Sequence, residues 1–318
     1  MGGAQVRPVT IIFAFFLVIA PLRADAQTPL ASIPYEIGYD GWITVKVAVN
    51  GAGPYDFIVD TGATLTLAFE NLRQEQSFTA TNLPPRRILG FASAITAPVT
   101  NIGDIEIGGE IMRDHQGVVL SDWAPPRKTP HGVLGLDFLS RYLMVVDRDA
   151  QRIELYAPDI VPDKIRKWPS APLEARSFGQ DLGALYTVDV RVNNRTAPFI
   201  VDLGASGTIL NFSMLRELYA GIRFNPSSAS GAATGTRLND INDKRDSGQL
   251  IRVLRIKIGR AYWRRPILLA FDAEIFRELG VASTPFGLLG ADLLSDRSFS
   301  LNFEKGEFRA ERKSRRTQ

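Results

Sequence analysis

The sequence predicts an all-β protein of two similar lobes, built by a tandem duplication and containing few short helices. Three observations support this prediction. Segments with a two-residue hydrophobic period recur, an apolar strand running into an aspartate occurs twice, and a Gly-rich motif repeats late in each half. With 45% hydrophobic and 22% charged residues, the composition is that of an ordinary globular protein.

The first 26 residues have the pattern of a secretory signal peptide. Arg7 supplies a positive charge, residues 9–20 form an apolar run, and Ala24 and Ala26 form a small-x-small cleavage site. The run is short for a membrane-spanning helix, which favours a cleaved signal peptide over the alternative, an uncleaved membrane anchor. No later segment is long and apolar enough to span a bilayer. We therefore expect export to the periplasm or the medium, with no stable membrane span after cleavage.

Each half opens with a predicted β-hairpin. In the first half, residues 42–50 alternate apolar and polar, and a Gly/Pro turn leads into residues 57–64 (FIVDTGAT). In the second half, residues 186–193 alternate in the same way, and a turn leads into residues 199–206 (FIVDLGAS). The two halves therefore carry the same strand, turn and strand in the same order.

The aspartates that follow these strands, Asp60 and Asp202, are candidate catalytic residues. A lone aspartate after a strand is usually a turn former, but two at matching points suggest carboxylates that face each other across a pseudo-two-fold axis. Such a pair can hold a water and share one proton, because two adjacent carboxylates do not both ionise readily. That is the chemistry of acid-base peptide hydrolysis.

Further matched segments follow in each half. A strand enters a tight turn at residues 105–109 and again at 256–260, and GVLGLDFLS at 132–140 matches GLLGADLLS at 287–295. Asp137 and Asp292, within these motifs, are expected to cap short helices. Final strands are expected at 143–147, 152–156, 299–303 and 307–310.

The expected organisation is a signal peptide at 1–26, a first lobe at 27–157, an inter-lobe linker at 158–180, a second lobe at 181–312 and a basic tail at 313–318. The linker is rich in proline, and an inter-lobe strand within part of it is left open. The best helix candidates are residues 211–220 and 273–279, where apolar side chains recur at helical spacing.

These motifs resemble the aspartic proteases, in particular the bacterial retropepsin-like aspartyl proteases. DTGA at 60–63, followed by GVLG at 132–135, carries the resemblance, and the second half repeats it. The resemblance implies a pepsin/retropepsin-like acid-protease fold whose two D-x-G loops meet at the floor of a cleft. It implies Asp60 and Asp202 as the catalytic pair, no metal or cofactor, and a peptide or protein substrate. Because both lobes lie in one chain, a monomer is expected, with a dimer left open.

The resemblance also assigns active-site loop support to Thr61, Gly62, Ala63, Leu203, Gly204 and Ala205. Leu203 departs from the family, which has Thr or Ser there with a hydroxyl that bonds the backbone of the other lobe. Thr61 is therefore expected to make this interlock without a symmetric partner.

Two segments are candidate flaps over the cleft, with an ordinary surface loop as the alternative for each. They are residues 88–93 in the first lobe and residues 227–235 in the second, the latter extended by the polar run 237–247. The candidate flap residues are Gly90, Phe91, Gly231 and Gly235.

The composition excludes or disfavours several kinds of chemistry and binding site. The absence of cysteine excludes disulfides, thiol catalysis and Cys-ligated metals. A net charge of +3 without an aromatic-basic module gives no support to nucleic-acid binding. His115 and His131 lie in no metal-ligand spacing and are expected at the surface or in loops.

Two functions other than a protease are compatible with parts of this pattern. A glycosidase also needs paired acids, but the repeat symmetry argues against it. The remaining alternative is a secreted, non-catalytic peptide-binding module derived from an aspartic protease, and Leu203 is its main support.

Overall fold

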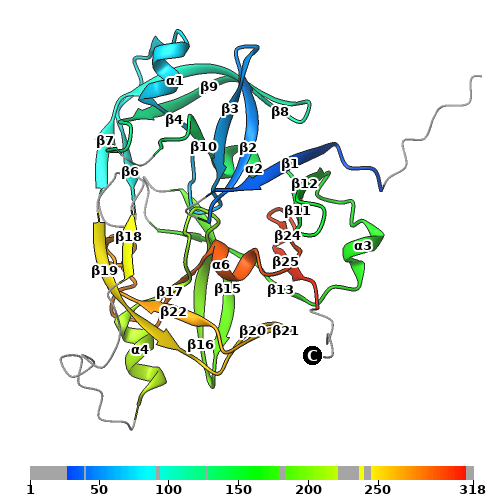
Figure 1. The fold of residues 1–318 in the computed structure, drawn as a ribbon, viewed down its shortest axis with the longest axis vertical. Coiled ribbons are helices and arrows are strands. Elements are labelled where there is room, and N and C mark those ends of the chain that lie inside the picture. Colours follow the sequence, from blue (N-terminus) through cyan, green and yellow to red (C-terminus); the bar gives the residue numbers. More distant parts are fainter. Residues whose placement is uncertain are drawn as a thin grey trace, which may run out of the picture.

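A computed structural model describes residues 27–38, 41–90, 94–125, 128–178, 183–220, 236–239 and 245–312. The prediction of an all-β protein with few short helices is confirmed, since strands dominate both lobes (Figure 1) and the longest described helix has 7 residues. The described helices are α1 (Glu70–Glu75), α2 (Leu136–Leu139), α3 (Asp163–Arg166), α4 (Phe212–Leu218), α5 (Glu274–Glu278) and α6 (Ala291–Leu294). The predicted signal peptide and basic tail lie outside the described residues.

Most strands of the first lobe form a sheet that closes on itself. In chain order they are β1 (Ala31–Ile37), β2 (Ile43–Val49), β3 (Ala52–Val59), β4 (Leu67–Phe69), β5 (Thr79–Ala80), β6 (Arg86–Leu89), β7 (Ala94–Ala97), β8 (Val99–Ile107), β9 (Glu110–Leu120), β10 (Gly132–Leu134), β11 (Leu143–Asp147) and β12 (Arg152–Tyr156). The order is β1-β2-β3-β10-β4-β9-β8-β5, and β2 also pairs with β8. The hairpin β6–β7 stands apart as its own two-stranded sheet.

The second lobe repeats this plan. Its strands are β13 (Ser170–Pro172), β14 (Glu174–Ser177), β15 (Ala184–Val192), β16 (Arg195–Val201), β17 (Ile209–Leu210), β18 (Thr236–Asn239), β19 (Arg245–Arg252), β20 (Arg255–Ile258), β21 (Ala261–Arg264), β22 (Ile267–Ala270), β23 (Gly287–Leu289), β24 (Phe299–Asn302) and β25 (Glu307–Ala310). The lobe sheet runs β18-β19-β22-β17-β23-β16-β15-β20-β21, with β14 on β15.

The same strand pairing presents the aspartate loop in both lobes. β3 runs parallel to β10 and antiparallel to β2, and β16 runs parallel to β23 and antiparallel to β15, so each loop leaves the sheet between a parallel and an antiparallel neighbour. Gly132 and Gly287 make this approach possible, because a Cβ on either would lie 2.3 Å from Cε1 of Phe57 or Phe199. The first glycine of each Gly-rich motif is therefore a packing requirement.

A sheet joins the two lobes. It runs β13-β25-β24-β11-β12-β1, and its centre is the antiparallel pair β11–β24, in which Val146 of the first lobe lies opposite Phe299 of the second. The predicted linker at 158–180 contains α3, β13 and β14. β13 pairs with β25 of this sheet and β14 pairs with β15, so part of the linker is built into sheets. The domain boundaries stay predictions.

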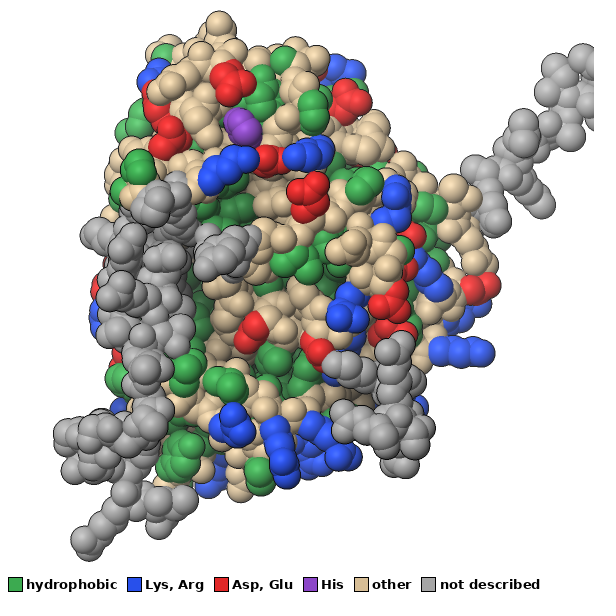
Figure 2. All heavy atoms as spheres, viewed as in Figure 1, with side chains coloured by type: hydrophobic (Ala, Val, Ile, Leu, Met, Phe, Trp, Pro, Cys, Tyr) green, Lys and Arg blue, Asp and Glu red, His purple; other side chains and the backbone are tan. Residues whose placement is uncertain are grey.

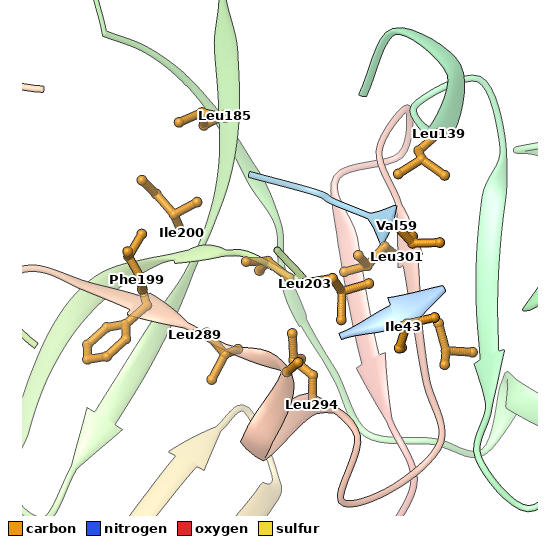
Figure 3. Packing of buried hydrophobic residues seen from close by; sticks show 14 of the residues in the cluster. Ile43, Val59, Leu139, Leu185, Phe199, Ile200, Leu203, Leu289, Leu294 and Leu301 are labelled. Carbon is orange, nitrogen blue, oxygen red and sulfur yellow. The ribbon is translucent and has the colours of Figure 1, made fainter. Parts of the chain in front are cut away.

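One apolar core extends across both lobes. It contains Val59 and Ile43 of the first lobe together with Leu203, Leu289 and Leu301 (Figure 3), and all five are 2% exposed or less. Burial of this kind stabilises by roughly 25 cal/mol for each Å² of apolar surface removed from water. The floor of the inter-lobe cleft therefore rests on a continuous hydrophobic layer.

The two helices predicted from apolar spacing are present within the predicted ranges. α4 begins after Asn211, whose side chain accepts a 2.9 Å hydrogen bond from Met214 N, as an N-cap residue does. α5 begins after Ala273 and ends before Leu279.

Candidate active site

Each aspartate is held by the turn that follows it. Oδ1 of Asp60 accepts hydrogen bonds from Gly62 N at 2.7 Å and Ala63 N at 3.1 Å. Oδ1 of Asp202 accepts from Gly204 N at 2.9 Å and Ala205 N at 3.0 Å. Two N–H donors fix one oxygen of each carboxyl, so the other oxygen remains available for chemistry.

The two loops meet across the lobes. A Cβ on Gly62 would lie 2.6 Å from Asp202 Cγ, and a Cβ on Gly204 would lie 2.3 Å from Asp60 Cγ. Both values are shorter than real Cβ contacts, so only glycine allows each loop to pass against the opposite carboxyl. The structure thus brings together Asp60 and Asp202 in the reciprocal arrangement that the duplicated motif predicts.

Their shared surroundings favour a protonated form. Burial raises the pKa of Asp60, against the opposing effect of the loop N–H donors. Burial, followed by repulsion from Asp60, raises the pKa of Asp202 well above its ordinary value. The two carboxyls titrate as one unit, which keeps a proton at pH values where an isolated aspartate is ionised.

The carboxyls line a cleft with apolar walls. The walls come from both lobes and include Trp42, Ile58, Trp123, Leu185, Ile209 and Leu288. Within the described residues, no group of three or more His, Cys, Asp or Glu side chains is arranged to hold a metal ion. The cleft therefore combines an apolar channel with one acidic pair.

The hairpin β6–β7 contributes to another wall of the cleft. Arg87, Ile88, Leu89 and Gly90 line the cleft. Arg87 reaches the second lobe and makes a 2.7 Å ion pair with Glu278 of α5. The other candidate flap residues Phe91, Gly231 and Gly235 lie outside the described residues. Of the predicted second-lobe flap, the strands β18 and β19 are described, and Figure 1 draws both hairpins at the left edge of the molecule.

The two loops are interlocked from one side. The buried Thr61 hydroxyl donates to Val201 O at 2.8 Å and accepts from Leu203 N at 3.1 Å. Leu203, at the matching position, has no hydroxyl to return these bonds and is fully buried in the shared core (Figure 3). The loops are thus joined by hydrogen bonds from Thr61 and by apolar packing from Leu203.

A comparison with known families bears on the first lobe. The sequence model of an aspartyl protease family matches residues 45–138, a range that contains the Asp60 loop and ends in α2. Residues 45–138 are thus similar to the aspartyl protease family. The resemblance drawn from the DTGA and GVLG motifs is therefore confirmed for the matched residues. Among curated proteins, no sequence matches the chain.

Thr66 joins the Asp60 loop to the start of α2. Its hydroxyl donates to Asp137 Oδ1 at 2.6 Å and accepts from Gly135 N at 2.9 Å. Thr208 repeats both bonds in the second lobe, to Asp292 at 2.6 Å and from Gly290 at 3.0 Å. Sequence reasoning did not select these threonines, although each stands six residues after its aspartate.

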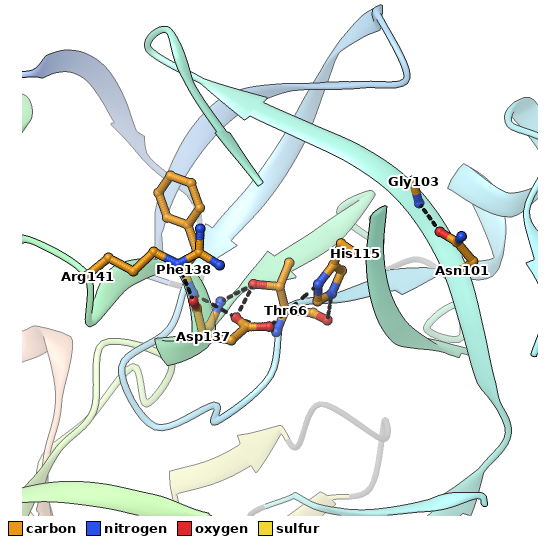
Figure 4. A network of polar contacts seen from close by, with 8 residues as sticks. Thr66, Asn101, Gly103, His115, Asp137, Phe138 and Arg141 are labelled. Carbon is orange, nitrogen blue, oxygen red and sulfur yellow. Dashed lines mark hydrogen bonds and ion pairs between the residues drawn. The ribbon is translucent and has the colours of Figure 1, made fainter. Parts of the chain in front are cut away.

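The predicted capping role of Asp137 and Asp292 needs correction. The N-cap residues of α2 and α6 are Gly135 and Gly290, and the aspartates lie within the first turn. Each carboxylate accepts from the next residue's N–H, and Asp137 also accepts from Thr66 N (Figure 4). Their hydrogen bonds with Thr66 and Thr208 join the short helices α2 and α6 to the loops that follow Asp60 and Asp202.

The prediction that His115 lies at the surface or in a loop was wrong. His115 is in strand β9, and only 6% of it is exposed. Its Nε2 lies 2.8 Å from Thr66 O, and since a carbonyl only accepts, Nε2 carries the proton (Figure 4). Burial lowers the pKa of His115, so the neutral ring is a structural partner of the Thr66 loop.

Trp42 is a second site residue that sequence reasoning missed. Its Nε1 donates to Gly204 O at 2.6 Å, so a first-lobe side chain holds the loop that carries Asp202. The ring also packs against Trp123, with centroids 5.3 Å apart. Trp42 therefore links the cleft wall to the position of the second aspartate.

Proposed function

We propose that this chain is an exported aspartic endopeptidase that hydrolyses peptide bonds through a water held by Asp60 and Asp202. The observation that carries the proposal is the reciprocal approach of the two loops, in which each glycine passes against the opposite carboxyl. The family match over residues 45–138 supports the same reaction class. Export rests on the signal-peptide pattern of residues 1–26, and we propose the periplasm or the medium as the location.

The reaction follows from one proton shared between two carboxyls, the behaviour on which aspartic proteases as a class depend. The ionised carboxyl takes a proton from the water as its oxygen attacks the peptide carbonyl carbon. The protonated carboxyl donates its proton to the carbonyl oxygen, which gives a neutral tetrahedral diol. The carboxyl that took the proton from water then gives it to the amide nitrogen as the C–N bond breaks, and the other carboxyl takes a proton from a diol hydroxyl, so the pair again holds one proton.

The walls of the cleft favour an extended peptide with apolar side chains on both sides of the cleaved bond. Apolar walls from both lobes flank the acidic pair, as described above. The hairpin β6–β7 is proposed as a flap at Gly90 and Phe91, with a second-lobe counterpart that includes Gly231 and Gly235. Because both aspartates belong to one chain, a monomer suffices for the site, and a dimer is not required.

A non-catalytic peptide-binding module is the second candidate. Leu203 favours it, because half of the hydroxyl interlock that the family uses is replaced by apolar packing. The intact bonds of Thr61 and the paired N–H donors on both aspartates favour the protease.

One experiment distinguishes the two. The purified mature chain is incubated with a diverse peptide library over a range of acidic to neutral pH, and products are identified by mass spectrometry. The protease proposal expects internal cleavage that is strongest at acidic pH and sensitive to Asp60→Asn. Peptide retention without any cleavage at any pH would refute the protease and support the binding module.

A further inference from the structure

A concentration of positive charge lies on and beside the β20–β21 hairpin, away from the cleft. Residues 252–267 contain six cationic side chains and no acidic one. The whole chain has a net charge of +3, so the other residues together carry −3. The cationic residues are Arg252, Arg255, Lys257, Arg260, Arg264 and Arg265. Figure 2 shows Lys and Arg side chains gathered at the lower edge of the molecule, where Figure 1 draws β20 and β21.

These cations face one another. Arg255 lies directly opposite Arg264 across the β20–β21 pair, and Arg191 of β15 lies opposite Lys257. Like charges directly opposite in a sheet are destabilising. In the part of the chain that the structure describes, none of the six hairpin cations has an acidic partner within ion-pair distance. The cluster therefore places like charges opposite each other, with no compensating ion pair among the described residues.

The fold itself does not require this charge. The corresponding hairpin of the first lobe, β8–β9, carries four acidic residues and one basic residue between positions 104 and 114. There Glu106 occupies the place of Lys257, and the single cation, Arg113, is 2.9 Å from Asp104. The same strand-turn-strand element is thus mainly acidic with one ion pair in the first lobe, and basic with no ion pair among the described residues in the second.

Exposed apolar side chains accompany the cations. Leu254 is 75% exposed, the largest value among the large hydrophobic side chains of the described residues, and Ile267 and Tyr262 are 48% and 41% exposed. Leu254 and Tyr262 line a shallow concavity of about 990 Å³ together with Arg255, Lys257, Arg260 and Arg264. Cations interleaved with exposed apolar groups are the composition that binds at a lipid interface.

We propose that this face, defined as residues 252–267 together with Arg191, docks the protein on an anionic lipid surface. The cations would contact lipid phosphates, and Leu254 and Ile267 would insert between the headgroups. A nucleic acid would satisfy the charges but would leave both aliphatic side chains without an apolar partner, so lipid fits the whole face better. The face and the cleft share no lining residue, so docking would use none of the residues that line the cleft.

The test is co-sedimentation of the mature chain with vesicles. Vesicles of equimolar phosphatidylcholine and phosphatidylglycerol should bind the protein, vesicles of phosphatidylcholine alone should not, and added salt should weaken binding. The double variant Arg255→Glu/Arg264→Glu should lower the partition coefficient at least about tenfold, because each cation near such a surface contributes appreciably to binding. Leu254→Ser should weaken binding while preserving the salt dependence.

The matched control reverses two exposed arginines elsewhere, Arg113→Glu/Arg148→Glu, and so makes the same change in net charge. Circular dichroism is to be recorded for each variant to check that it is folded. The proposal requires the control to bind anionic vesicles much more tightly than Arg255→Glu/Arg264→Glu. Equal loss in both double variants, binding to neutral vesicles, or binding to duplex DNA without binding to anionic vesicles would each overturn it.

Discussion

Replacing Thr61 by valine tests whether its hydroxyl joins the two aspartate loops. Valine keeps the shape of the buried threonine but removes the hydroxyl that donates to Val201 O and accepts from Leu203 N. Each bond contributes about 1 kcal/mol, and each stranded buried partner raises the loss further, so Thr61→Val should lower the free energy of unfolding by about 2–4 kcal/mol. Since Leu203 supplies no second hydroxyl, turnover of a cleaved peptide should also fall at least about tenfold.

Urea titration monitored by tryptophan fluorescence measures the loss. The control is Thr61→Ser, which keeps the hydroxyl and removes one methyl, and it should lose less than Thr61→Val. If Thr61→Val stays within about 0.5 kcal/mol of the parent chain, the hydroxyl does not carry the interlock and the reasoning about the loops fails.

Three further substitutions test the surroundings of the pair. Leu203→Thr is compared with Leu203→Val, because threonine and valine have similar shapes. Leu203→Thr should be the more stable variant by ~0.5–1.5 kcal/mol if backbone groups of the other loop can bond its hydroxyl, and the less stable one by ~1–3 kcal/mol if the core has repacked around an apolar side chain. Urea titrations of both variants decide between the two outcomes. Asp202→Asn should raise the free energy of unfolding at neutral pH and change it little near pH ~3. Because the pKa of Asp202 is raised in the folded parent chain, that chain loses stability as the pH rises above the pKa of an unfolded aspartate, about 3.9. Unfolding measurements at both pH values check the sign. Trp42→Phe removes the donor to Gly204 O and should lower turnover. The control Trp263→Phe removes a comparable 3.0 Å bond to Leu293 O and should lower stability without lowering turnover. Equal kinetic effects of the two tryptophan variants would contradict a positioning role for Trp42.

The aspartate pair was predictable because the duplication itself encodes it. Two copies of strand, aspartate and glycine at matching points imply a two-fold arrangement, and the glycine requirement seen at Gly62 and Gly204 is the physical form of that motif. Strand positions followed from the two-residue hydrophobic period, and α4 and α5 from helical spacing.

What escaped prediction depends on contacts between distant segments. The bond from Trp42 to Gly204 joins residues 162 positions apart, and no local pattern marks it. His115 turned inward because the alternation of β9 shifts at Asp114, which has a positive φ of 47° next to an irregular β8–β9 register. A local period cannot locate such a bulge without knowledge of the partner strand.

The central claim is that Asp60 and Asp202 act as one catalytic unit. Its most direct measurement is the cleavage rate of one library-derived peptide, at the optimal acidic pH, by the parent chain, Asp60→Asn, Asp202→Asn and the double variant. We predict that each single variant loses nearly all activity and that the double variant loses no more, because the two residues share one step. A single variant that keeps more than about a tenth of the parent rate, a change of only ~1.4 kcal/mol in the barrier, would contradict the account.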